Sequence, residues 1–194
     1  MQEQFIQSAV KSKTAMKKKI SAAMLTKLAM MTAISIVLLM VVRIPFPPAP
    51  FLVFDIADMP IYITAFAYGP VAGLLVTFVV CCLQAFALGG DGLYGFLMHF
   101  VATGIVTVVI GMMYKHCKTK KQAIKALLVG VLLTVIVMCG MNLLVTPFYM
   151  GVEIKAVIAM LPTVIIPFNF LKAGLNSLLT FILYKRISGF LHKQ

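Results

Sequence analysis

Long apolar segments, separated by short basic or proline-rich and glycine-rich breaks, constrain the fold of this chain more than any other feature. A helix needs about 20 apolar residues to cross the hydrocarbon core of a bilayer, and several segments approach that length. The composition agrees, because 62% of the 194 residues are hydrophobic and 11% are charged, whereas soluble domains have about half and a quarter. The sequence therefore predicts an all-α integral membrane protein.

Breaks in the hydropathy divide the chain into six predicted transmembrane helices. We expect them at residues 22–42, 59–68, 71–88, 93–114, 126–148 and 167–184. The second segment would rise only about 15 Å as a helix, so it must be tilted, extended or sheltered by its neighbours. The prolines of residues 45–50 predict a rigid extended loop, and Asp58 is expected to cap the next helix. Pro162 and Pro167 are expected to interrupt the segment before the sixth span.

Most of the basic residues gather in three places, which are the N-terminus, residues 115–125 and residues 185–193. The net charge of +12 could suggest a nucleic-acid partner, but these clusters follow the positive-inside rule for cytoplasmic loops, and no basic groove with aromatic platforms accompanies them. We therefore expect the protein to lie in a lipid bilayer and to bind no nucleic acid. Both termini are expected to be cytoplasmic. The predicted organisation is a basic cytoplasmic segment (1–21), a six-helix membrane domain (22–188) and a cytoplasmic tail (189–194). Four of the five acids are expected outside: Asp55, Asp58, Asp91 and Glu153.

Lys172, in the sixth predicted span, is the most informative single residue. A lysine near the middle of a bilayer costs roughly 2.5–3.5 kcal/mol on insertion scales, so it is seldom kept without a partner. Asn169 lies one turn earlier on the same helix face, and Asn142 is a strongly polar residue of the fifth span. These three residues predict a shared polar pocket, although Asn142 could instead make an interhelical hydrogen bond worth about 0.6 kcal/mol. Asn176 is more typical of helix packing.

Ala29 and Ala33 lie four residues apart on one face of the first predicted helix. Small residues at this spacing let a second helix approach closely. The spacing alone favours ordinary packing within the chain, and docking of another subunit is the alternative.

Enzyme and metal motifs are missing from the sequence. There is no serine–histidine–acid set and no phosphate-binding P-loop, and the four cysteines have neither a disulfide framework nor zinc-ligand spacing. We therefore expect a protein that is not an enzyme, with no metal and no cofactor, which draws energy from a partner. A self-sufficient secondary transporter or channel would instead transport alone, and a membrane enzyme would need an acid or nucleophile that the spans lack.

Three segments carry a resemblance to a known family. They are PPAPFLVFDIADMP at 47–60, YGPVAG at 68–73 and IPFNFLKAGLNSLLT at 166–180. They resemble the riboflavin-specific S component of energy-coupling factor (ECF) vitamin transporters, and the similarity spans roughly residues 22–188. The resemblance implies the S-component fold, with six helices that bind a vitamin at the outer face of the bacterial plasma membrane.

The resemblance also implies partners and residue roles. The S component docks on a transmembrane coupling subunit that carries two cytoplasmic ATPase subunits, and Ala29 and Ala33 would face the coupling subunit. Asn142, Asn169 and Lys172 would bind the edge of the isoalloxazine ring of riboflavin, whose carbonyl acceptors and imide donor suit amide and ammonium groups. The proline-rich loop would cover the site from outside. Another vitamin, such as pantothenate or a thiamin precursor, is the nearest competing ligand, because one fold serves several ligands.

Overall fold

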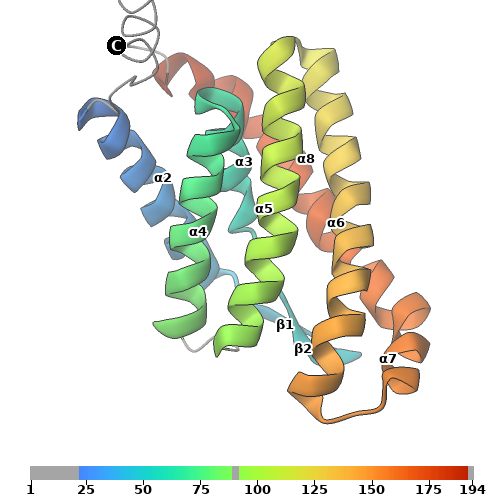
Figure 1. Ribbon diagram of the computed structural model, residues 1–194. Coiled ribbons are helices and arrows are strands. Elements are labelled where there is room, and N and C mark those ends of the chain that lie inside the picture. The colour runs from blue at the N-terminus through green and yellow to red at the C-terminus, as the bar shows by residue number, and fades with distance from the viewer. Residues whose placement is uncertain (1–21, 89–91, 192–194) are drawn as a thin grey trace, which may run out of the picture.

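A computed structural model of the chain describes residues 22–88 and 92–191 as a bundle of helices with one small β-hairpin at its end (Figure 1). The N-terminal segment 1–21, part of the glycine-rich connection and the last three residues lie outside the described residues, and with them the expectations made for those segments. In chain order the elements are α2 (Ala22–Val41), β1 (Ile44–Phe46), β2 (Ala49–Phe54), α3 (Asp58–Tyr68), α4 (Pro70–Phe86), α5 (Gly92–His116), α6 (Lys120–Met150), α7 (Ile154–Met160), the π-helical turn η1 (Leu161–Ile165) and α8 (Ile166–Leu191).

Four helical segments of the described chain are long and apolar enough to cross a membrane: α2, α5, α6 and the continuous stretch Ile154–Arg186. The helix α4 is apolar but shorter. The helix α3 has only 11 residues, and every side chain from Met59 to Phe66 is buried, so neighbouring helices shelter the short second segment as expected. With the stretch from α7 to α8 taken as one unit, the described chain contains the six helical segments that the hydropathy predicts.

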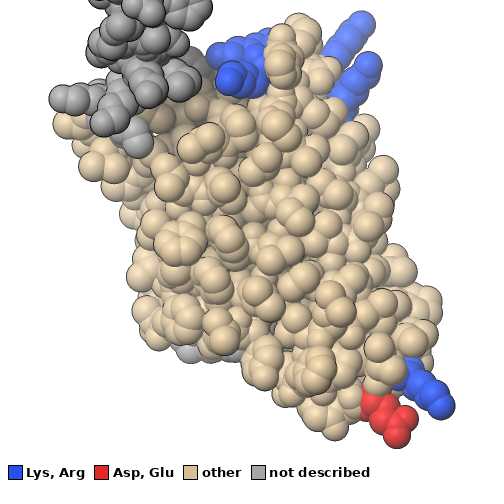
Figure 2. All heavy atoms as spheres, viewed as in Figure 1, with Lys and Arg blue, Asp and Glu red and all other residues tan. Residues whose placement is uncertain are grey.

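Charged side chains on the face shown in Figure 2 gather at the two ends of the bundle, and the band between them carries none. In Figure 1 the start of α2, the connection between α5 and α6 and the end of α8 lie at one end of the bundle. The hairpin and the turn between α6 and α7 lie at the opposite end. Both ends of the described chain thus lie on one side, as an even number of crossings requires.

The proline-rich segment forms the antiparallel hairpin β1–β2, so the expectation of a purely helical fold is corrected to a mostly helical one. Ile44 pairs with Phe54 and Pro45 with Val53, and the register shifts between Pro45 and Phe46. A two-stranded sheet consists of edge strands only, where proline is tolerated because one side of each strand needs no hydrogen-bond partner. The prolines therefore shape the hairpin rather than exclude it.

The prolines before the sixth span do not interrupt the helix, which corrects a second expectation. Pro162 lies in the π-helical turn η1, and such turns widen a helix locally without ending it. Pro167 lies in the first turn of α8, directly after this π-helical turn. The helix α6 also begins six residues before the predicted start, at Lys120, where the Thr119 side chain accepts a hydrogen bond from the Gln122 amide at 3.2 Å.

Close packing around α3 fixes the centre of the bundle. Phe66 stacks on Tyr114 with ring centroids 4.5 Å apart, and both rings contact Tyr184 of α8. A Cβ atom at Gly73 would come within 2.6 Å of the Thr107 side chain, so glycine is what lets α4 approach α5 this closely. The cavity that holds the predicted binding residues lies at the other end of the bundle, toward the hairpin.

Candidate ligand-binding site

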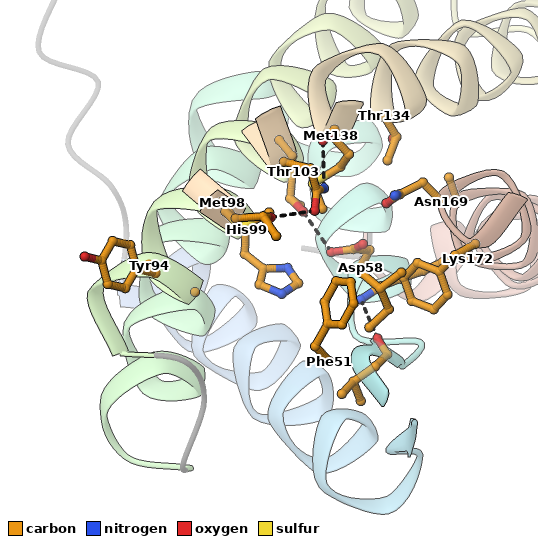
Figure 3. A pocket seen from close by; sticks show the side chains of 18 of the residues that line it. Phe51, Asp58, Tyr94, Met98, His99, Thr103, Thr134, Met138, Asn169 and Lys172 are labelled. Carbon is orange, nitrogen blue, oxygen red and sulfur yellow. Dashed lines mark hydrogen bonds between the residues drawn. The ribbon is translucent and has the colours of Figure 1, made fainter. Parts of the chain in front are cut away.

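A cavity opens between α3, α5, α6 and α8 at the hairpin end of the bundle, and β2 covers one side of it (Figure 3). Much of its wall is apolar or aromatic, with Phe51 from β2, Met98 from α5, Met138 from α6 and Phe168 from α8. Flat rings and flexible thioethers of this kind pack well against conjugated ligands. A small set of polar side chains interrupts this wall, as is usual in sites that bind small organic molecules.

Lys172 is one of these polar residues, and it is paired. Its Nζ lies 2.7 Å from the Asp55 Oδ2 atom and 3.4 Å from the Val53 carbonyl oxygen. Asp55 is only 3% exposed and Lys172 only 8%, so both members of the ion pair are buried. Isolated buried charges are very costly, and pairing offsets much of that cost. The lysine that the sequence marks as needing a partner therefore finds it 117 residues away.

Asp55 itself is held in place from several directions. Its Oδ1 accepts a hydrogen bond from the Ala57 amide at 3.1 Å, and the Asn176 side chain donates to its backbone carbonyl at 3.0 Å. The Ser35 hydroxyl of α2 donates to the Ala57 carbonyl. Burial alone would raise the pKa of the Asp55 carboxyl, but the Lys172 charge, His99 and the hydrogen bonds together hold it below its usual value. Asn176 thus contributes to packing between α8 and the segment before α3, consistent with its predicted role.

Asn142 and Asn169 line the same cavity as Lys172, so the structure brings together the three predicted binding residues. Each donates one hydrogen of its Nδ2 group to the carbonyl one turn earlier, Asn142 to Met138 and Asn169 to Ile165, both at 2.8 Å. An amide nitrogen carries two hydrogens, so a second donor remains on each for a ligand. Their contact with a ligand stays a prediction.

Asp58 and Thr103 also line the cavity, and sequence reasoning did not place them there. The expected capping role of Asp58 is wrong, because the N-cap of α3 is Ala57 and no side chain caps it. The Asp58 carboxylate instead accepts a hydrogen bond from the Thr103 hydroxyl of α5 at 3.2 Å. His99 lies across the cavity, 3.4 Å from the Gln84 side-chain nitrogen. No local sequence signal could have paired Asp58 with Thr103, because Asp58 begins α3 and Thr103 lies 45 residues later in α5.

A second hollow, which differs from the cavity in its lining, runs between α2 and α4. It is an open groove with an almost wholly apolar lining, and Ala29 and Ala33 lie in it beside Ile36 and, from α4, Val76 and Phe78. Both alanines are exposed. No helix of the described chain covers them fully, and their contact with another subunit stays a prediction.

Comparison with known proteins gives the family. The model of the family "ECF transporter, substrate-specific component" matches residues 23–184. The riboflavin transporter RibU of Staphylococcus aureus (strain TCH60) is 31% identical over 176 residues, which cover 87% of this chain and 92% of the relative. The riboflavin transporter FmnP of Bacillus subtilis (strain 168) is 26% identical over 180 residues, which cover 88% and 94%.

Solved structures agree with this assignment. The S component of a bacterial ECF transporter superposes with a TM-score of 0.74 at 29% identity, over 87% of this chain and 97% of that one. The S component for biotin from an ECF-type ABC transporter superposes with a TM-score of 0.62 at 22% identity, over 88% and 95%, a likeness that shows the fold alone. The family and its relatives are membrane transporters rather than enzymes. The match over residues 23–184 shows that this chain belongs to the family of substrate-specific components of ECF transporters, and that it is a membrane protein.

Proposed function

We propose that this chain is the substrate-binding subunit of an ECF-type ABC transporter in the bacterial plasma membrane, and that it captures riboflavin from outside. The observation that carries the proposal is the convergence of Asn142, Asn169 and Lys172 on one otherwise largely apolar cavity. Both riboflavin transporters named above support riboflavin as the ligand, because they align over most of the chain. The biotin relative shares the fold alone, so the ligand must follow from the residues of the cavity.

The chemistry of the cavity suits a flavin ring. The isoalloxazine ring is flat and conjugated, and Phe51, Met98 and Phe168 supply faces on which it can pack. Its pyrimidine edge offers two carbonyl acceptors and one imide N–H donor. The free amide hydrogens and the ammonium can donate to those carbonyls, and an amide oxygen can accept from the imide. Most of the binding free energy would come from buried apolar contact, with the polar groups fixing the orientation of the ring.

The groove between α2 and α4 is where we place the coupling subunit, which would connect this chain to two cytoplasmic ATPase subunits. Two exposed alanines one turn apart leave room for the backbone of a partner helix to approach closely. Membership in the ECF family supports a coupling partner. In this arrangement both termini are cytoplasmic and the hairpin faces outward, because the basic residues of the connection between α5 and α6 and those near the end of α8 lie at the opposite end of the bundle.

The test is direct. The purified full chain in detergent should quench the fluorescence of added riboflavin stoichiometrically. An excess of pantothenate, a thiamin precursor or biotin should not displace the bound riboflavin. In proteoliposomes the chain alone should not accumulate riboflavin, whereas co-reconstitution with its coupling subunit and ATPases should give ATP-dependent uptake. Uptake by the chain alone would identify a secondary transporter, and binding of a different vitamin would reassign the ligand.

A further inference from the structure

The positive and negative charges of the side chains at the cavity do not cancel. Lys172 is neutralised by Asp55, to which it is bound at 2.7 Å. Asp58 is a second carboxylate in the cavity wall, and the hydrogen bond that the described part of the chain gives it comes from the uncharged Thr103 hydroxyl at 3.2 Å. At pH 8, where an ordinary histidine is neutral, two carboxylates and one ammonium leave one net negative charge at the cavity.

The Asp58 carboxylate is aimed at the ligand space. Asp58 lines the cavity, and in Figure 3 its carboxylate is drawn between the His99 ring and the Lys172 side chain. The Arg43 guanidinium lines a second pocket, which shares Phe51 and His99 with the cavity, and it donates to the Leu88 carbonyl at 3.1 Å. Arg43 is thus not part of the wall that Asp58 shares with the asparagines.

A carboxylate in such a wall discriminates among ligands by charge. It accepts hydrogen bonds from hydroxyl or N–H groups, and it repels anions strongly, because an enclosed apolar site screens charges far less than water does. A neutral flavin with a polyol chain offers donors to it. The same flavin esterified with phosphate brings a further negative charge into the site.

We propose that Asp58 contacts the ligand and is the specificity residue that makes this site select an uncharged flavin over its phosphate ester. The inference rests on the proposed function and deepens it. It assigns Asp58 a role that differs from those of Asn142, Asn169 and Lys172, which orient the ring. Thr103 acts as a positioning residue, because its hydroxyl holds one carboxylate oxygen and leaves the other toward the ligand space.

The experiment compares three flavins of nearly equal size by fluorescence quenching of the full chain in detergent at pH 8, where an ordinary histidine is neutral. They are riboflavin, flavin mononucleotide (FMN), and a riboflavin whose terminal hydroxyl is replaced by an amine. The wild-type chain should bind FMN at least about tenfold more weakly than riboflavin, which is about 1.4 kcal/mol, and should bind the amine at least as tightly as riboflavin.

In Asp58→Asn, which keeps the shape of the side chain and removes the charge, the ratio of the FMN and riboflavin Kd values should fall by about tenfold. The matched control is Glu153→Gln, which removes an exposed acid outside the cavity and should leave the ratio at the wild-type value. The amine-bearing flavin tests the proposal on the wild-type chain, so the proposal stays testable even if Asp58→Asn does not fold.

The outcomes separate this inference from the proposed function. If the wild-type chain binds none of the three flavins, the proposed function fails. If it binds riboflavin but the ratio is the same in Asp58→Asn, or if the amine binds more weakly than riboflavin, the role of Asp58 is overturned while riboflavin binding stands.

Discussion

The cavity and the groove between α2 and α4 are built in opposite ways. The cavity is enclosed and partly polar, and its wall combines β2, α3, α5, α6 and α8 (Figure 3). The groove is open and apolar and needs only two helices. An apolar surface is ordinary for a protein in lipid, so a partner helix can recognise the groove only by its hollow shape, which small side chains create. A water-soluble solute instead needs polar groups that lipid cannot reach.

Binding and docking can therefore be altered separately, and each variant below should affect one region and not the other.

The largest effect is expected from Lys172→Met, which should weaken riboflavin binding by about a hundredfold or more and lower the melting temperature. Lys172 is proposed to donate to the ligand, and its loss also leaves the buried Asp55 charge without its ion-pair partner. Breaking a buried pair in this way typically costs about 3–5 kcal/mol. Fluorescence titration and thermal unfolding in detergent measure the two effects. Lys155→Met, which changes an exposed lysine, is the control and should change neither.

A double variant separates the two roles of this lysine. In Lys172→Met with Asp55→Asn neither member of the ion pair is left charged without the other, so the melting temperature should recover, because neutral replacements of buried pairs are often tolerated. Riboflavin binding should stay weak. Recovery of binding in the double variant would mean that Lys172 serves only to neutralise Asp55, and its place among the ligand contacts would be lost.

In the groove, Ala33→Trp should reduce ATP-dependent riboflavin uptake at least about tenfold in proteoliposomes that contain the complete transporter, and Ala29→Trp should do the same. The indole ring fills the hollow and prevents close approach of a partner helix. Riboflavin affinity in detergent should be unchanged, since neither alanine lines the cavity. The matched control is Ile136→Trp on α6, at a position that is 68% exposed and outside the groove. Normal uptake by both alanine variants would place the coupling subunit elsewhere.

The two regions also differ in how far the sequence predicted them. The groove depends on a local pattern, because Ala29 and Ala33 share a helix face by spacing alone. What the spacing could not decide was whether α4 or another subunit fills that face. Both side chains are exposed, so no helix of the described chain covers them fully, and docking of another subunit there stays a prediction.

For the cavity, hydropathy located the spans, and the cost of burying Lys172 predicted a pocket around it. The prediction missed Asp55 as its partner, because hydropathy assigns an aspartate beside a proline-rich segment to solvent. Pairing over 117 residues depends on the hairpin β1–β2 folding back under α8, which is a tertiary arrangement. Asp58 was misread for a similar reason, since helix-start patterns favour capping and do not report that Thr103 of α5 lies nearby.

A smaller effect within the cavity is expected from Asn142→Ala, which should weaken riboflavin binding about tenfold without affecting docking. The variant removes one donor and one acceptor, and a buried partner left unsatisfied costs about 1–3 kcal/mol. Gln122→Ala, at the other end of α6 and outside the cavity, is the control for loss of an amide. Unchanged affinity in Asn142→Ala would restore the alternative that this residue makes only helix contacts.

The smallest effect should come from Thr146→Val, with riboflavin affinity reduced about two- to threefold. The Thr146 hydroxyl donates to the Asn142 Oδ1 atom at 2.9 Å, so it fixes which way the amide of Asn142 faces, and a single neutral hydrogen bond contributes about 1 kcal/mol or less. Thr163→Val, at an exposed position where the hydroxyl donates to a helix carbonyl, is the matched control. If Thr146 acts through the amide, its effect should disappear in an Asn142→Ala background, since residues in one hydrogen-bond network are not additive. An equal loss in both backgrounds would mean that Thr146 affects the ligand independently of Asn142.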